Sequence, residues 1–150
     1  MSRASALKQL GLSDQDWGPC YSDEFTHAQF AEKWRGAVAC PSKADILSAG
    51  VAAARPLKII EVKAEAQRRI YVVLPQWKQA NLTARGVELN TKLLMGGTLT
   101  QSEKDEQTAG FALWEKVKAI RVASNLIEQD ILASAVPASF DVVGSGRWPV

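Results

Sequence analysis

Apolar and polar positions alternate with helical spacing over the stretch from Leu57 to Ala135. In the first part of this stretch, apolar or small residues recur at steps of three and four, with Thr91 as the one polar interruption. The positions are Ile70, Val73, Trp77, Ala80, Ala84, Val87 and Leu94. This spacing places them along one side of a helix, so it predicts a first helical arm.

A second arm with the same kind of stripe follows the turn Met95-Gly96-Gly97-Thr98. Its apolar positions are Leu113, Val117, Ile120, Ala123, Ile127 and Ile131. The segment Thr100-Gln101-Ser102-Glu103 matches a capping box, which marks the start of this arm. Because each apolar stripe must be covered, we expect the arms to pack as an antiparallel helical hairpin. Trp77 should then face the second arm or a symmetry mate.

Pro75 interrupts the first arm, since a proline inside a helix removes one hydrogen bond and clashes with the preceding turn. The apolar spacing continues through Trp77, so one kinked helix is expected rather than two separate ones. At 1.5 Å per residue such an arm would reach about 55 Å, which predicts an elongated or oligomeric protein. Upstream, Val62, Ala66 and Ile70 are spaced four and four, so a regular heptad is not sustained there.

The residues before the hairpin predict short helices. Ser5–Leu10 could form a helical turn that ends at Gly11. For Asp23–Trp34 the spacing of the aromatic side chains favours a helix capped by Ser22, and a short hairpin is the alternative.

A clearer helix should begin at Ser42, because Asp45 three residues later completes an approximate capping box. Pro56 disfavours helical backbone at the residue before it, so this helix is expected to end near Arg55-Pro56. Residues 1–55 are therefore interpreted as a small N-terminal attachment part.

The tail after Pro137 is apolar for a chain terminus. Residues 138–143 are β-like in composition, and residues 139–143 could add as a strand to the sheet edge of a neighbour. Gly144-Ser145-Gly146 should be flexible and let Trp148 reach a pocket on another protein. The predicted partner-binding residues are Trp148, Phe140, Val142, Val143 and, in the N-terminal part, Trp17. The alternative is that the tail folds back over its own hairpin.

Taken together, the pattern predicts a mainly α fold in three parts: residues 1–55, a long antiparallel helical hairpin over 56–136, and an extended tail over 137–150. A composition of 47% hydrophobic and 23% charged residues is ordinary for one domain of this length. The net charge of +2 is too small to indicate a nucleic-acid or anionic membrane partner. No apolar run reaches the length of a membrane span, and no signal peptide is expected.

Residues that could carry chemistry are few. His27 is the one histidine, and neither Cys20 nor Cys40 lies in a nucleophile or zinc-ligand pattern. We therefore expect no catalytic residues, cofactor, metal or small-molecule substrate. The two cysteines are interpreted as free thiols, with a bridge between them as the alternative in an oxidising compartment.

Four segments carry a resemblance to a known group of proteins. They are KAEAQRRI (63–70), LPQWKQANLTAR (74–85), LWEKVKAIRVASN (113–125) and Arg147-Trp148-Pro149. Over residues 55–150 the chain resembles small tail-fibre-associated and tail-assembly proteins of tailed bacteriophages and prophages. Residues 1–54 carry no such resemblance.

The resemblance implies a non-enzymatic virion protein at the tail or tail-fibre base, which passes through the host cytoplasm during assembly. Its implied partners are other phage tail or fibre proteins and further copies of itself. The alternative function is a tail assembly chaperone that is absent from the mature particle.

Overall fold

The computed structural model describes residues 3–12, 26–32, 34 and 39–149, and these residues are mainly α-helical. The helices are α1 (Arg3–Gln9), α3 (His27–Glu32), α4 (Lys43–Val73), α5 (Gln76–Leu94) and α6 (Gln101–Ala133), followed by the 3-10 helix η2 (Pro137–Ser139). No strand occurs in the described ranges, including the segment after Pro137 that was expected to be β-like. The mainly α fold class is confirmed.

The chain forms two compact units. The first comprises Met1–Glu61 and Asp130–Asp141, and the second comprises Val62–Gln129 and Val142–Val150. Both α4 and α6 contribute residues to each unit, so the borders between the units lie inside helices.

The first unit is built on α1, α3 and the beginning of α4. Its core cluster consists of Ala6, Leu7, Phe30, Ile46 and Ala49, with Leu12, Trp34 and Cys40 partly buried against it. The predicted helical turn at Ser5–Leu10 is confirmed up to Gln9, where α1 ends, and Leu10 lies in the turn that follows. Gly11 follows it with a φ of 76°, a conformation that favours glycine at a helix end.

Helix α3 is the helix favoured within Asp23–Trp34, although it is shorter than expected. Thr26 caps it: the Thr26 hydroxyl accepts from the Gln29 amide at 3.3 Å, and the Thr26 amide donates to Gln29 Oε1 at 2.9 Å. This reciprocal pair is a capping box. The expected cap, Ser22, lies outside the described residues.

Helix α4 begins as predicted but does not end where predicted. The Ser42 hydroxyl accepts from the Asp45 amide at 3.1 Å, and Asp45 Oδ2 accepts from the Ser42 amide at 3.1 Å. The expected end near Arg55-Pro56 is wrong, because α4 continues through Pro56 to Val73. Pro56 lies on the exposed side of the helix, where water can satisfy the carbonyl group that loses its donor.

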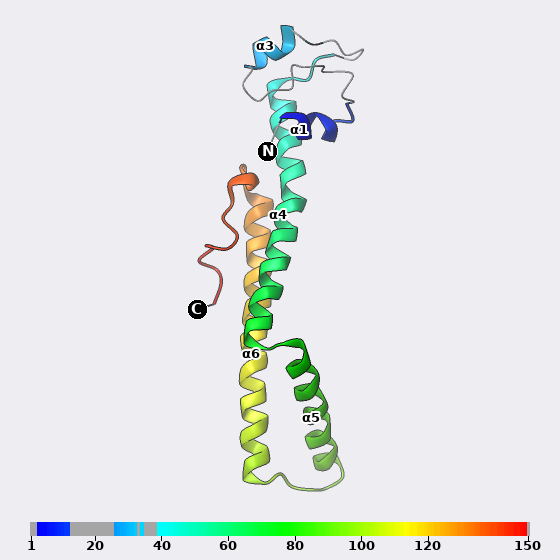
Figure 1. Cartoon of the computed structure of the whole chain (residues 1–150), viewed down its shortest axis with the longest axis vertical. Coiled ribbons are helices and arrows are strands. Elements are labelled where there is room, and N and C mark those ends of the chain that lie inside the picture. The colour runs from blue at the N-terminus through cyan, green and yellow to red at the C-terminus, as the bar shows by residue number, and fades with distance from the viewer. Residues whose placement is uncertain (1–2, 13–25, 33, 35–38, 150) are drawn as a thin grey trace. The chain divides into compact units, whose positions relative to one another are not determined.

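The helix is interrupted at Pro75 instead, so the prediction of a single kinked arm is wrong. Helix α4 ends at Val73, and α5 starts at Gln76 with Pro75 as its N-cap residue (Figure 1). The Leu74 side chain is fully buried, and its carbonyl accepts a hydrogen bond from Gln79 Nε2 at 2.8 Å. These two contacts stabilise the break locally.

The turn between α5 and α6 follows the prediction. Gly96 has a φ of 80°, and the Gly97 amide donates to the Lys92 carbonyl at 2.9 Å. A Cβ atom on Gly97 would lie 2.9 Å from the same carbonyl oxygen, so the turn requires glycine there. This hydrogen bond and the one from Gly96 to Leu93 form a Schellman motif that ends α5.

The predicted stripe of α6 is confirmed as a buried face. Val117, Ile120, Ala123 and Ile127 are at most 4% exposed in the second unit, and Ile131 is fully buried in the first. Val62 and Ala66 of α4 are also buried in the second unit. In this unit α4 and α5 together form one side of the antiparallel hairpin and α6 forms the other.

The predicted face of α5 is wrong. Trp77, Val87 and Leu94 are 67%, 61% and 88% exposed, so this stripe faces away from α6. The Trp77 indole is therefore not part of the chain's own core. Leu89, which is 2% exposed, lies on the side of α5 that packs on α6.

Candidate docking site

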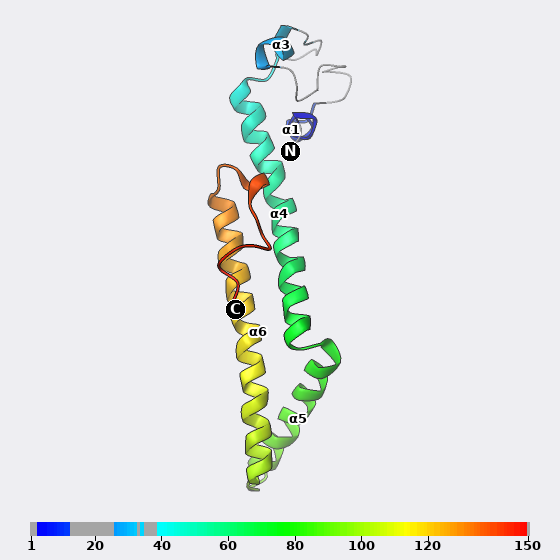
Figure 2. The same ribbon diagram turned by 60° about the vertical axis from the view of Figure 1, so that its left-hand side comes forward.

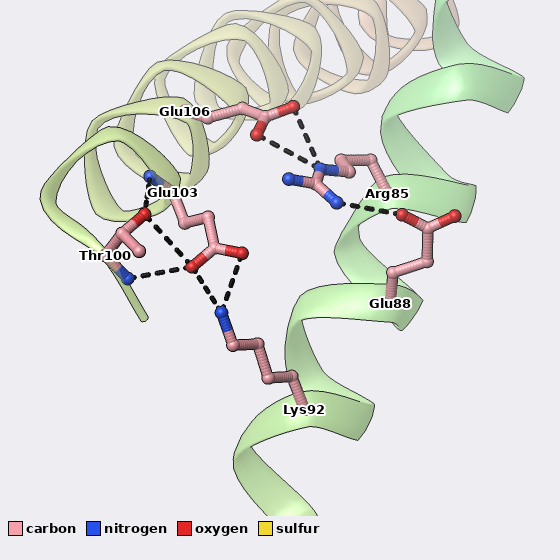
Figure 3. A network of polar contacts seen from close by, with 6 residues as sticks. All are labelled: Arg85, Glu88, Lys92, Thr100, Glu103 and Glu106. Atoms are coloured by element: carbon pink, nitrogen blue, oxygen red, sulfur yellow. Dashed lines mark hydrogen bonds and ion pairs between the residues drawn. The ribbon is translucent and has the colours of Figure 1, made fainter. Parts of the chain in front are cut away.

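Helix α5 packs on α6 through a narrow mixed surface. Leu89 is buried there, and Leu82 approaches Gly110, with 3.6 Å between the Leu82 Cδ2 atom and the position of a Cβ on that glycine. Two ion pairs flank these contacts: Lys92 with Glu103 at 2.7 Å and Arg85 with Glu106 at 3.1 Å (Figure 3). The side of α5 that faces α6 thus buries Leu89 and carries ion pairs at its edges.

Glu103 links the start of α6 to the end of α5. Its carboxylate accepts from Lys92 Nζ at 2.7 Å and from the Thr100 amide at 2.8 Å (Figure 3). The hydrogen bond from Lys92, followed by that from the Thr100 amide, lowers the pKa of Glu103 to about 2. Its carboxylate is therefore ionised at neutral pH, and the predicted capping box of α6 is confirmed.

This packing leaves a complete apolar stripe of α5 uncovered. We define the outer stripe as Trp77, Ala80, Ala84, Val87, Thr91 and Leu94, all of which are exposed. Apart from Thr91, the polar interruption, these residues belong to the stripe whose spacing predicts the hairpin core. An uncovered stripe of this length on a folded helix is typical of a protein contact surface.

The C-terminal tail, by contrast, folds back along the chain, and in the second unit it runs beside α4 and α6 (Figure 2). We define the tail site as Glu65, Arg69, Val142, Val143 and Trp148. The Trp148 side chain is 6% exposed, and its Nε1 donates to the Val142 carbonyl at 2.8 Å. The Arg69 guanidinium lies 4.9 Å from the centre of the Trp148 ring and donates to the Val143 carbonyl at 3.2 Å.

Glu65 holds Arg69 in place. The Glu65 side chain is 8% exposed and accepts hydrogen bonds from Arg68 and Arg69 at 2.7 Å. The hydrogen bonds from Arg68, with a further one from Arg69, lower the pKa of Glu65 to about 2 despite its burial. A buried carboxylate thus orients the arginine that covers the tryptophan.

The predicted partner-binding residues differ in burial. Trp148 and Val142 are buried in the second unit, Val143 is 60% exposed, and Phe140 is half-buried in the first unit. The tail thus takes the alternative, folded-back arrangement, and the idea of a free tail is wrong for residues 138–149. Trp17 lies outside the described residues. Binding of a partner by any of these five residues stays a prediction.

Sequence reasoning missed both the tail site and the inner face of α5. A signal for the first was present, since Glu65 precedes Arg68 and Arg69 by three and four residues, the spacing of helical ion pairs. Nothing local indicated that this group would receive Trp148 from the other end of the chain.

Other polar groups of the described residues form no recognisable catalytic arrangement. His27 Nε2 lies 2.9 Å from the Pro41 carbonyl oxygen, and Cys40 is a free thiol whose pKa is raised by burial. Cys20 lies outside the described residues. Within the described ranges no group of three His, Cys, Asp or Glu side chains could hold a metal ion, and no helix could span a membrane.

Comparison of the chain with protein families, with curated proteins and with solved structures finds no match.

Proposed function

We propose that this chain is a non-enzymatic structural protein of a tailed bacteriophage, located at the tail or tail-fibre base. It acts by docking on other tail or fibre proteins and by association with further copies of itself. It passes through the host cytoplasm during assembly and ends in the virion.

One observation carries this proposal: segments that resemble phage tail proteins, although far apart in the sequence, meet in the second unit. Arg69 of the first segment covers Trp148 of the last one. Pro149 lines a surface pocket together with Lys116, Ala119 and Ile120 of the third segment. The resemblance therefore involves residues that lie together in the second unit, which supports a common structural origin better than isolated similar stretches would.

The distribution of surface also supports a docking role. The residues of the tail site find their contacts within the chain. The outer stripe of α5, in contrast, exposes large apolar side chains on a helix that ion pairs join to α6. A rigid helix with an uncovered stripe binds without the cost of folding on contact.

Quantitative mass spectrometry of purified phage particles tests this function. A structural component is expected at a fixed copy number in every preparation, also after stringent washing. A chain that is absent from particles but bound to tail or fibre subunits in infected cells would support the alternative, an assembly chaperone. Absence from both particles and assembly intermediates would contradict a tail function altogether.

A further inference from the structure

We propose that the outer stripe of α5 is covered by the same stripe of a second copy of this chain, in a short antiparallel two-helix coiled coil. The inference deepens the proposed function and rests on its self-association, since it names the surface and the orientation by which two copies would meet.

The outer stripe has a complete heptad spacing. Trp77, Ala84 and Thr91 occupy the first core position of the repeat, and Ala80, Val87 and Leu94 occupy the second. A stripe that repeats every 3.5 residues is best covered by a helix with the same repeat, because side chains of each helix then fit between those of the other. The chain supplies such a helix in every copy.

The sizes of the side chains favour the antiparallel orientation. A two-fold axis between Ala84 and Val87 would pair Trp77 with Leu94, Ala80 with Thr91, and Ala84 with Val87 of the partner. Each pair then recurs at the other end, so the two helices are farther apart at both ends of the contact than at its centre. A parallel pair would stack two Trp77 indoles one layer from two alanines, and the helices would splay at that end.

The residues that flank the outer stripe would not repel a second copy. The flanking positions are Gln76, Asn81, Thr83, Glu88, Asn90 and Met95. Glu88 is the one charged residue among them, and Arg85 of the same helix neutralises it at 3.0 Å. Coiled coils that avoid pairing with themselves usually carry several like charges at these positions. Here each copy contributes only Glu88, whose charge Arg85 already offsets.

The expected affinity is modest because the stripe is short. From Trp77 to Leu94 it extends about 26 Å, so the contact falls at the small end of specific interfaces. The helix is already formed on α6, however, and dimerisation need not supply the free energy of helix formation. We therefore expect a dissociation constant on the order of micromolar.

Sedimentation equilibrium of the full-length chain tests the proposal through two matched valines. Val87 lies on the outer stripe and is 61% exposed, whereas Val72 of α4 lies off the stripe and is 75% exposed. Val87→Lys should raise the dimer dissociation constant at least about tenfold, because it buries an unpaired charge at the contact. Val72→Lys should leave the constant within about twofold.

A variant that strengthens the contact shows whether weaker dimerisation of Val87→Lys could be due to misfolding. Thr91→Leu replaces the one polar core position and should lower the dissociation constant by about fivefold or more. A wild-type chain that stays monomeric at about one hundred times the expected constant would overturn the proposal. Equal effects of Val87→Lys and Val72→Lys, with unchanged helix content, would also overturn it.

These results are separable from those on the phage function. A chain found in particles but monomeric in solution would contradict the α5 contact and leave the tail function intact. A dimer that depends on Val87 but never occurs in particles or assembly intermediates would support the α5 contact and contradict the tail function.

Discussion

At the scale of single residues, two tryptophans on helical or tail positions have opposite surroundings. Trp148 is 6% exposed, donates to the Val142 carbonyl and lies under Arg69, whereas Trp77 is 67% exposed. We expect Trp148→Ala to lower the free energy of unfolding by about 3–5 kcal/mol, as for other buried indoles. Urea denaturation monitored by circular dichroism measures this.

Trp77→Ala is the matched control for that prediction. At protein concentrations well below the dimer dissociation constant it should change the free energy of unfolding by less than about 0.5 kcal/mol. If the two substitutions destabilise the monomer equally, the tail is not held as described.

The Glu65 carboxylate makes the stability of the second unit depend on pH. Its pKa in the folded chain is about 2, below the ordinary value of 4.5. A group with a lowered folded pKa stabilises the protein fully above the ordinary value, and this contribution is lost as pH falls through 2. The wild-type chain should therefore lose stability between pH 4.5 and 2.

Glu65→Gln should reduce that loss, and at pH 7 it should lower the free energy of unfolding by about 1–3 kcal/mol, because the arginines lose a charged partner and one acceptor oxygen. Denaturation curves at a series of pH values test both effects. Parallel pH dependences of the wild type and the variant would show that Glu65 does not contribute as its contacts suggest.

At the scale of helices, capping decides where the elements start. The Thr100 hydroxyl accepts from the Glu103 amide at 3.3 Å, and Thr100→Ala should cost about 1 kcal/mol. Thr108, inside α6, donates to the Lys104 carbonyl of the preceding turn at 2.9 Å. Thr108→Ala should be neutral or slightly stabilising, since alanine has the higher helix propensity. Thermal melts of the two variants compare them, and an equal loss would argue against the cap.

The helices, the Gly96-Gly97 turn and the caps at Ser42 and Thr100 could be predicted from the sequence, because spacing and capping act within a few residues. The outcome at the two prolines could not. Pro56 is tolerated because it lies on an exposed side, and the break at Pro75 coincides with burial of Leu74, which depends on distant residues.

The face of α5 could not be predicted for a related reason. The helix carries the outer stripe and also Leu82 and Leu89, so hydrophobicity alone leaves two choices. The structure takes the side of Leu82 and Leu89, where Arg85 and Lys92 also pair with acids of α6, so the choice depends on residues of another helix. The tail site likewise could not be predicted, because it joins Glu65 and Arg69 to residues more than 70 positions later in the sequence.

At the scale of the whole molecule, the two surfaces differ in what they offer a partner. The tail site is closed within the chain, and the outer stripe of α5 is open. A second copy that covers this stripe would remove the large exposed side chains of Trp77, Val87 and Leu94 from water together. The proposed self-association would then follow from the same packing that turns the stripe away from α6.

Cross-linking of lysines in an equimolar mixture of chains labelled with different nitrogen isotopes tests this arrangement most directly. In an antiparallel pair, Lys78 of one copy lies at nearly the same height as Lys92 of the other, within reach of a lysine cross-linker, although both side chains point away from the contact. We predict abundant Lys78–Lys92 links between differently labelled chains, which should disappear in Val87→Lys and persist in Val72→Lys. Links found only within single chains, at concentrations above the expected dissociation constant, would contradict the account.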